Sequence, residues 1–156
     1  MRITDYLSRR AVVPELRATT KDEVLRELAG ALAADHPEID ADDLAAALAE
    51  RERLGSTGLQ DGVAIPHARA KGARRIAVAV GRSRAGIDFD SVDRKPATLF
   101  FLLVSPEDAP GSHLTALARI VDAGRDEAFR RAAARAKTGR EILEALRRAD
   151  ERPARG

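Results

Sequence analysis

The stretch Thr98-Leu99-Phe100-Phe101-Leu102-Leu103-Val104 predicts a β-strand at the centre of the fold. It is apolar throughout and lies between Pro96 and the pair Ser105-Pro106, which are typical strand boundaries. A strand that is apolar on both faces has to be covered on both faces. We therefore expect a central sheet that is flanked by helices.

Further elements follow on both sides of this strand. The β-branched run Ile76-Ala77-Val78-Ala79-Val80-Gly81 predicts a second buried strand. Earlier in the chain, apolar residues repeat at helical spacing over 21–34, behind a capping box that begins at Thr20. Another helix is expected to begin at Asp40 and to end near Arg53.

The two ends of the chain complete the pattern. Ala11-Val12-Val13 predicts an edge strand, and helical spacing returns in the C-terminal part around Leu114, Phe129 and Ile142. Strands that alternate with helices indicate an α/β fold. The predicted fold is a single-domain α/β sandwich with a mixed central β-sheet flanked by helices.

Length and composition exclude several classes of protein. The chain has 156 residues, which is the size of one domain, and it contains no cysteine. Disulfide frameworks, thiolate zinc sites and cysteine nucleophiles are therefore excluded. The sequence has no apolar run long enough for a membrane span, and Met1-Arg2-Ile3-Thr4-Asp5 does not begin a signal peptide. We expect a cytoplasmic protein.

The charge pattern favours an anionic ligand over a nucleic acid. The net charge is +2, and the central segment 62–118 contains more basic than acidic residues. A nucleic-acid module usually shows a dense basic stripe with aromatic residues for stacking, whereas aromatic residues make up 3% of this chain and tryptophan is absent. We expect no nucleic-acid partner.

A glycine-rich loop follows the predicted helix that ends near Arg53. Gly55-Ser56-Thr57-Gly58 is followed by Gly62, so the loop can turn backbone N–H groups inward as an anion-binding concavity. The loop has neither the Gly-Lys-Ser/Thr of a Walker loop nor the spacing of a dinucleotide fingerprint. Nucleotide binding therefore has no support from these glycines.

Two histidines and an arginine are the candidate reactive groups. His67 follows Pro66, which restricts the backbone next to the imidazole, and His113 lies at the expected start of a helix, where free N–H groups favour an anion. Arg51 lies at the end of the helix before the loop. Together these groups suit a phosphoryl group held on His67. Each has a structural alternative: a hydrogen-bonded structural histidine, a water-exposed helix residue and a surface ion pair.

The run from Gly55 to Arg69 resembles the signature of the enzyme IIA family of the phosphoenolpyruvate-dependent phosphotransferase system. The similarity is to its fructose–mannitol class, which includes the nitrogen-regulatory enzyme IIA. It continues through Gly86-Ile87-Asp88-Phe89-Asp90, the strand 98–104 and His113-Leu114. The resemblance covers residues 1–148, which we expect to be an enzyme IIA domain, with a polar C-terminal tail over 149–156.

The resemblance implies a role for each matched residue. His67 matches the phosphorylated histidine, which accepts phosphoryl on Nε2 from phospho-HPr or its nitrogen-branch homologue. His113 matches a second histidine that binds the phosphoryl oxygens, and Arg51 matches an arginine near the site. The matched loop residues that pack against the phosphohistidine are Gly55, Ser56, Thr57 and Gly58. Gln60 departs from the family, which often has glycine there. No cofactor or metal is implied.

Two roles and one further class of protein stay open at this point. A regulator would change its contacts with target proteins when His67 is phosphorylated, whereas a sugar-uptake enzyme IIA would pass the phosphoryl group to an enzyme IIB. The chain has no cysteine-dependent IIB segment, so any acceptor is expected on another polypeptide, and this slightly favours the regulator. A metal-dependent hydrolase is disfavoured, because His36, His67 and His113 have no paired ligand spacing.

Overall fold

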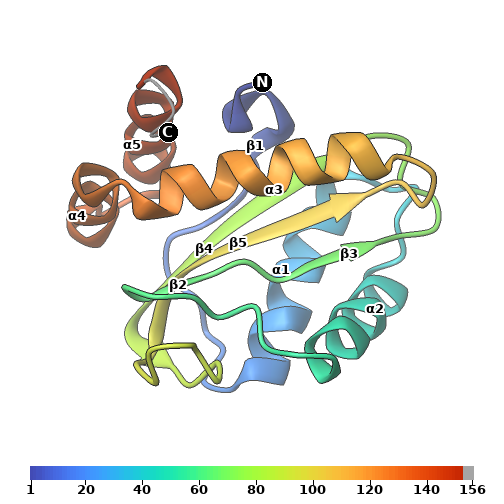
Figure 1. The fold of residues 1–156 in the computed structure, drawn as a ribbon, viewed down its shortest axis with the longest axis horizontal. Coiled ribbons are helices and arrows are strands. Elements are labelled where there is room, and N and C mark those ends of the chain that lie inside the picture. The colour runs from blue at the N-terminus through green and yellow to red at the C-terminus, as the bar shows by residue number, and fades with distance from the viewer. Residues whose placement is uncertain (153–156) are drawn as a thin grey trace.

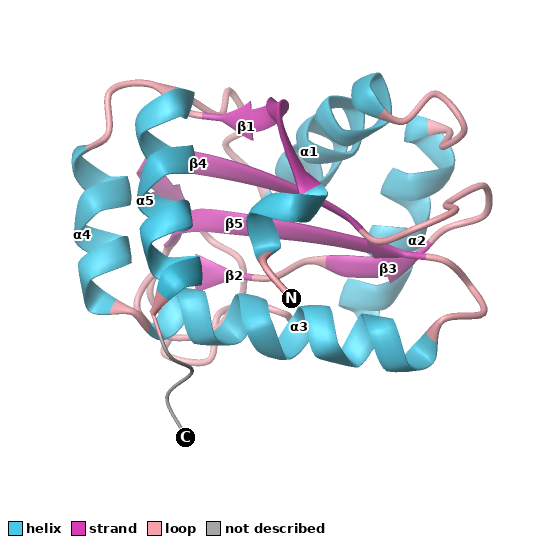
Figure 2. Cartoon of the chain, turned by 90° about the horizontal axis from the view of Figure 1, so that it is seen from above, coloured by secondary structure: helices cyan, strands magenta, loops and turns pink. Residues whose placement is uncertain are grey.

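The computed structural model describes residues 1–152 as an α/β sandwich of three layers (Figure 1). Figures 1 and 2 show the sheet between two sets of helices, with α1 and α2 on one face and α3, α4 and α5 on the other. The expected fold class is therefore confirmed. The elements in chain order are a 3-10 turn at Ile3–Tyr6, β1 Leu7–Val13, α1 Lys21–Asp35, α2 Ala41–Arg53, β2 Val63–Ala64, β3 His67–Arg69, β4 Ala77–Ile87, β5 Ala97–Ser105, α3 Pro110–Arg125, α4 Glu127–Arg135 and α5 Gly139–Glu151.

The sheet is mixed and centres on β5. Its strand order is β1-β4-β5-β2, and β3 also pairs with β5, further along the same edge than β2. β4 runs antiparallel to β5, whereas β1 is parallel to β4 and both β2 and β3 are parallel to β5. The expected edge strand at the N-terminus is β1. The strand predicted over 98–104 is thus β5, and both short strands, β2 and β3, pair with it.

Side-chain alternation along β5 assigns its residues to the two faces. Phe100 packs against Phe89, with ring centroids 5.5 Å apart, and Phe101 packs against Phe129 of α4, with centroids 5.9 Å apart. All four rings are fully buried. Ser105, four residues after Phe101, therefore points to the face that carries α3, α4 and α5.

Side-chain caps begin four of the helices. Thr20 accepts a hydrogen bond from the backbone of Glu23 before α1, and Asp40 accepts one from Asp43 before α2. Thr138 and Asp126 cap α5 and α4 in the same way. These caps satisfy N–H groups that a helix leaves unpaired. They explain why the helix starts expected at Thr20 and Asp40 agree with the structure.

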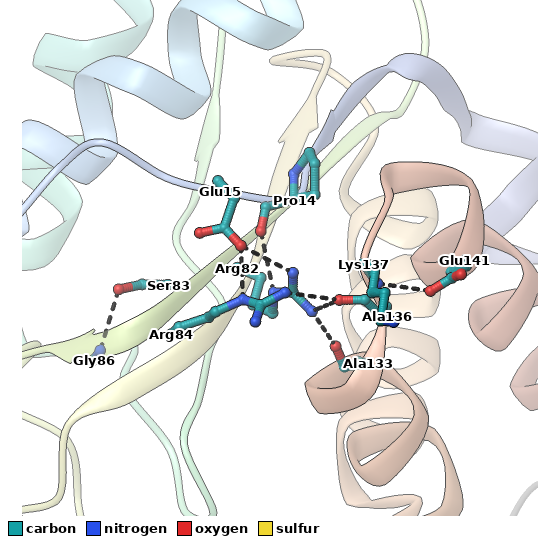
Figure 3. A network of polar contacts seen from close by, with 10 residues as sticks. All are labelled: Pro14, Glu15, Arg82, Ser83, Arg84, Gly86, Ala133, Ala136, Lys137 and Glu141. Carbon is teal, nitrogen blue, oxygen red and sulfur yellow. Dashed lines mark hydrogen bonds and ion pairs between the residues drawn. The ribbon is translucent and has the colours of Figure 1, made fainter.

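A buried arginine of β4 ties the sheet to the end of α4 (Figure 3). The Arg82 guanidinium donates to the carbonyls of Pro14 at 3.1 Å and Ala133 at 2.7 Å, to the carbonyl of Ala136, and to the carboxylate of Glu15 at 3.2 Å. Its side chain is 3% exposed. Because the last carbonyls of a helix lack partners within the helix, Arg82 provides donors that α4 itself cannot provide.

The C-terminal helix continues beyond the expected domain end at residue 148. α5 ends at Glu151, and within it Asp150 is buried and accepts hydrogen bonds from the backbones of Ile3 and Thr4, both at 3.0 Å. The helix thereby fastens the N-terminal 3-10 turn. Residues 153–156 of the expected tail lie outside the described residues. Among residues 1–152, no helix is both long and apolar enough to cross a membrane.

Candidate active site

His67 is placed by a short strand that the sequence did not predict. Pro66 interrupts the edge of the sheet after β2, but its carbonyl accepts a hydrogen bond from the backbone of Leu103 at 3.0 Å, so the chain stays on β5. β3 then begins at His67, which pairs in register with Leu103. The backbone that carries the imidazole is therefore bound to β5 at Pro66 as well as at His67.

One nitrogen of His67 is committed to a hydrogen bond. Nδ1 lies 2.8 Å from the carbonyl oxygen of Ile65, and a carbonyl oxygen only accepts. In the neutral ring the proton is therefore on Nδ1 and the lone pair is on Nε2. Nε2 has no hydrogen-bond partner within residues 1–152, so its lone pair is available to an electrophile.

The surroundings of His67 keep its ring neutral. Burial lowers the pKa of His67 below its usual value of 6.5, and the positive charge of Arg51 lowers the pKa further. The hydrogen bond to Ile65 and the charge of Glu52 act in the opposite direction without reversing the result. A neutral imidazole is the nucleophilic form.

His113 enters the site from α3. The helix begins at Pro110, so His113 lies one turn inside it and not at its start, and its side chain is buried and not exposed to water. Its Nδ1 lies 2.5 Å from the hydroxyl of Ser105 at the end of β5. Burial lowers the pKa of His113, and the positive charges of His67, when that ring is protonated, and of Arg69 lower the pKa further.

The structure brings the two histidines together. The ring centroids of His67 and His113 are 5.4 Å apart, and the ring planes are tilted by 52°. The rings come from different elements, the edge strand β3 and the helix α3. Two imidazoles at this separation can act on the same small group.

Arg51 is half-buried at the end of α2, and its charge acts on His67. Its Nη1 donates to the carbonyl of Gly55 at 2.9 Å, so the guanidinium also closes the turn that begins the glycine-rich loop. Gly55 has a φ of 151°, in the region that favours glycine. Arg51 is thus a positive charge held beside His67 by the loop.

The hydroxyls of the glycine-rich loop are engaged within the protein. The Ser56 hydroxyl donates to the carbonyl of Phe89 at 2.5 Å and accepts from the backbone N–H of Gly58 at 3.0 Å. The Thr57 hydroxyl donates to the carboxylate of Glu52. Gly58 packs so closely on Ser91 that an added Cβ would lie 2.5 Å from its hydroxyl. These contacts shape the loop itself.

A buried carboxylate that sequence reasoning missed anchors this loop. Glu52, 8% exposed, accepts from the backbone N–H of Thr57 at 3.1 Å and from Nζ of Lys21 at 2.9 Å. The carbonyl of Thr57 in turn accepts from the backbone N–H of Ile65 at 3.0 Å, and the carbonyl of Ile65 holds His67. A continuous series of hydrogen bonds therefore leads from Glu52 to the imidazole.

The site offers nitrogen and hydroxyl groups but no set of metal ligands. Within residues 1–152, no group of three or more histidine, aspartate or glutamate side chains is arranged to hold a metal ion. His36 lies at the end of α1, where it pairs with Glu38 at 3.4 Å. The arrangement around His67 is a neutral nucleophile beside a second imidazole and a fixed positive charge.

One known family matches this chain over most of its length. Residues 5–149 match the family described as "Phosphoenolpyruvate-dependent sugar phosphotransferase system, EIIA 2". The match covers the whole sheet and nearly all of α5.

Curated relatives fall into two groups. A nitrogen regulatory protein of Bradyrhizobium diazoefficiens is 40% identical over 127 residues, which are 81% of this chain and 82% of that protein. A fructose-specific EIIABC component of Bacillus subtilis is 34% identical over 120 residues, which are 77% of this chain and 19% of that protein. The chain thus matches about four fifths of the first protein and about a fifth of the second.

A solved structure agrees with the first group. The crystal structure of the nitrogen regulatory protein IIA-Ntr from Neisseria meningitidis has a TM-score of 0.85 and 31% sequence identity, and the match covers 92% of this chain and 98% of that one. The fold is therefore shared over almost the full length of both chains.

Proposed function

The chain belongs to the EIIA 2 family of the phosphoenolpyruvate-dependent sugar phosphotransferase system, and we propose that it accepts a phosphoryl group on Nε2 of His67. The observation that carries this proposal is the hydrogen bond from Nδ1 of His67 to the carbonyl of Ile65. It leaves Nε2 as the one ring nitrogen with a free lone pair. It also lets the ring react without first losing a proton.

The proposed step is a transfer between two histidines. The Nε2 lone pair of His67 forms a bond to phosphorus, the bond between phosphorus and the donor nitrogen breaks, and the donor imidazole keeps that electron pair. Nδ1–H of His67 stays bound to Ile65 throughout. Catalysis then rests on positioning and on charge stabilisation, as is usual for phosphoryl transfer.

His113 and Arg51 would stabilise the transferred group. His113 lies against His67 and can donate a hydrogen bond to a phosphoryl oxygen, and Arg51 supplies a positive charge. Ser56, Thr57 and Gly58 would act indirectly, since their contacts hold the loop that carries the backbone of Ile65. Gly55 would act in the same way, through its carbonyl bond to Arg51.

Exposed apolar residues beside the site suit the docking of a phosphorylated donor protein. Leu54, 81% exposed, directly precedes the glycine-rich loop, and Leu114, 65% exposed, directly follows His113. Exposed large apolar side chains next to a reactive group are typical of a protein-binding surface. The donor is phospho-HPr or its nitrogen-branch homologue.

The main role of the phosphorylated chain is regulation of target proteins. This role is supported by the similarity to nitrogen regulatory proteins, which extends over 82% and 98% of the two relatives. Phosphorylation changes the charge of the surface between Leu54 and Leu114, and a charge change at a docking surface changes which partners bind. The second candidate, transfer to an enzyme IIB in sugar uptake, is favoured by the similarity to the fructose-specific component.

Reconstitution with purified components tests the proposal. The protein is incubated with phosphoenolpyruvate, enzyme I and HPr, and its intact mass is measured before and after mild acid. We expect one acid-labile phosphoryl group on the wild type and none on His67→Ala. An adduct on His67→Ala, or no adduct on the folded wild type, contradicts the assignment. Transfer from the phosphorylated protein to IIB proteins of the same cell then separates uptake from regulation.

A further inference from the structure

Ser105 ends β5 in direct contact with the ring of His113. Its hydroxyl oxygen lies 2.5 Å from Nδ1 of His113, and the residue is 0% exposed. The hydroxyl has no other hydrogen-bond partner within residues 1–152. The backbone of Ser105 is fixed as well, because its carbonyl accepts from Ala70 at 3.0 Å and it pairs in register with Arg69.

Counting protons determines the direction of this hydrogen bond. A serine hydroxyl has one hydrogen to donate, and a neutral imidazole has one N–H and one lone pair. If Nδ1 carried the proton and donated to Ser105, the serine hydrogen would be left without an acceptor in the protein interior, which is unfavourable. If Ser105 donates to Nδ1, both groups are satisfied, and the proton of His113 is on Nε2.

We propose that Ser105 is a positioning residue that donates to Nδ1 of His113 and thereby keeps the proton of that ring on Nε2, where it can bind the phosphoryl group on His67. The inference rests on the proposed function, because it specifies how His113 would serve the phosphoryl group. Nothing in the transfer step requires Ser105 to touch that group.

The tautomer of His113 decides whether the ring attracts or repels a phosphoryl oxygen. With the proton on Nε2, the ring presents a donor. With the proton on Nδ1, it would present a lone pair to an anion, which is repulsive. The choice matters at neutral pH, because the lowered pKa of His113 leaves the ring uncharged, with a single proton to place.

The two rings of the site then carry complementary groups. His67 is protonated on Nδ1 by its bond to Ile65 and presents a lone pair on Nε2. His113 is protonated on Nε2 by its bond to Ser105 and presents a hydrogen. One ring can bond to phosphorus while the other binds an oxygen of the same group. Ser105 at the end of β5 and Ile65 just before β3 thus assign opposite roles to two identical side chains.

The experiment is a comparison of wild type, Ser105→Ala and Ser83→Ala by ¹⁵N NMR of histidine-labelled protein at neutral pH. Ser83 is the matched control, because it is a buried strand serine whose hydroxyl accepts from Gly86 and does not contact a histidine. In the wild type and the control, we expect His113 to have a protonated Nε2 and an unprotonated Nδ1. In Ser105→Ala, the protonated-Nε2 population should fall.

Transfer rates from phospho-HPr extend the comparison. Ser105→Ala should lower the rate by about 10-fold or more, by analogy with the loss of the hydrogen-bond partner that orients a metal-bound histidine. Ser105→Thr, which keeps the hydroxyl, should restore the tautomer and much of the rate. Ser83→Ala should transfer at the wild-type rate.

Two results would overturn the proposal. One is a proton on Nδ1 of His113 in the wild type, and the other is a Ser105→Ala protein with the wild-type tautomer and the wild-type rate. The NMR comparison needs no phosphoryl donor. A protein that is never phosphorylated but shows the expected tautomer would therefore contradict the proposed function and not the hydrogen bond of Ser105.

Discussion

The rings of His67 and His113 lie 5.4 Å apart, and each has its Nδ1 bound to a group of the central sheet region: the Ile65 carbonyl for His67 and the Ser105 hydroxyl for His113. Neither Nε2 atom has a hydrogen-bond partner within residues 1–152. This relationship is the basis for the predictions that follow.

Replacing His113 by alanine should slow phosphoryl transfer to His67. The variant loses a fixed donor to the phosphoryl group, and removal of such a donor typically costs about 10²–10³-fold in rate. The measurement is the initial rate of phosphorylation by phospho-HPr, with the fold checked by circular dichroism. His36→Ala, which removes the third histidine of the chain, is the control and should keep the wild-type rate. Equal rates for all three proteins would place His113 outside the site.

Acid should slow phosphorylation at a lower pH than the usual titration of histidine would suggest. Protonation of His67 removes the lone pair on Nε2, and burial together with the charge of Arg51 lowers the pKa of this ring below 6.5. The fraction of neutral His67 should therefore exceed that of an ordinary histidine at each pH and should decline at a lower pH than it does in an unperturbed imidazole. NMR titration of His67 measures this fraction directly, with a peptide of residues 62–72 as the reference.

Arg51→Gln provides the matched test of the charge effect. Removing the positive charge should raise the pKa of His67 relative to the wild type. Arg53→Gln removes an exposed charge of the same helix and should leave the titration as it is. A wild-type titration that coincides with that of the peptide would contradict the account of both residues.

Replacing Glu52 by glutamine should destabilise the protein by about 2 kcal/mol, a typical value for a hydrogen bond to a charged group. The carboxylate of Glu52 is buried and accepts from Lys21 and from Thr57, and the amide cannot accept from both in the same way. Urea unfolding measures the loss. Glu50→Gln breaks an exposed pair with Arg53 and should cost less than about 1 kcal/mol. Equal effects of the two substitutions would show that Glu52 has no special role.

Arg82→Met should lower the free energy of unfolding without changing the rate of phosphorylation. The substitution removes the donor of the Pro14 carbonyl and the shorter of two hydrogen bonds to each of the Ala133 and Ala136 carbonyls, which keep bonds of 3.3 Å from the Ala136 backbone and from Arg84. An unsatisfied buried group costs about 1–3 kcal/mol. We expect a loss of about 3 kcal/mol or more in urea unfolding. Phosphorylation of His67 in the folded fraction should remain at the wild-type rate, because Arg82 belongs to a different part of the sheet. A folded variant that is not phosphorylated would contradict this separation. Arg84→Met is the comparison, because Arg84 contacts Ala136 and Glu15 as well but is 57% exposed, and it should destabilise the protein less than Arg82→Met.

The central strand and most helices could be predicted from sequence because their signals are local. The apolar run 98–104 corresponds to β5 at Ala97–Ser105, and the helix expected over 21–34 corresponds to α1 at Lys21–Asp35. Thr20 and Asp40 act as expected because a cap depends only on residues in the next turn.

The remaining features depend on contacts between distant segments. β3 is three residues long and follows a proline, so its strand character comes from pairing with β5 and not from its own sequence. α3 starts at Pro110, earlier than expected, because proline is favoured in the first turn of a helix although Ala109 offers no side-chain cap. Glu52 reads as a surface charge at the end of a helix, and only the fold brings Lys21 to it.

The measurement that tests the central claim most directly is the location of the phosphoryl group after reaction with phosphoenolpyruvate, enzyme I and HPr. Combined ³¹P and ¹⁵N NMR of histidine-labelled protein identifies the nitrogen that is bonded to phosphorus. The account predicts one phosphorus, on Nε2 of His67, with Nδ1 still protonated. A phosphorus on Nδ1 of His67, on His113 or on His36 would contradict it, as would a folded protein that carries no phosphorus at all.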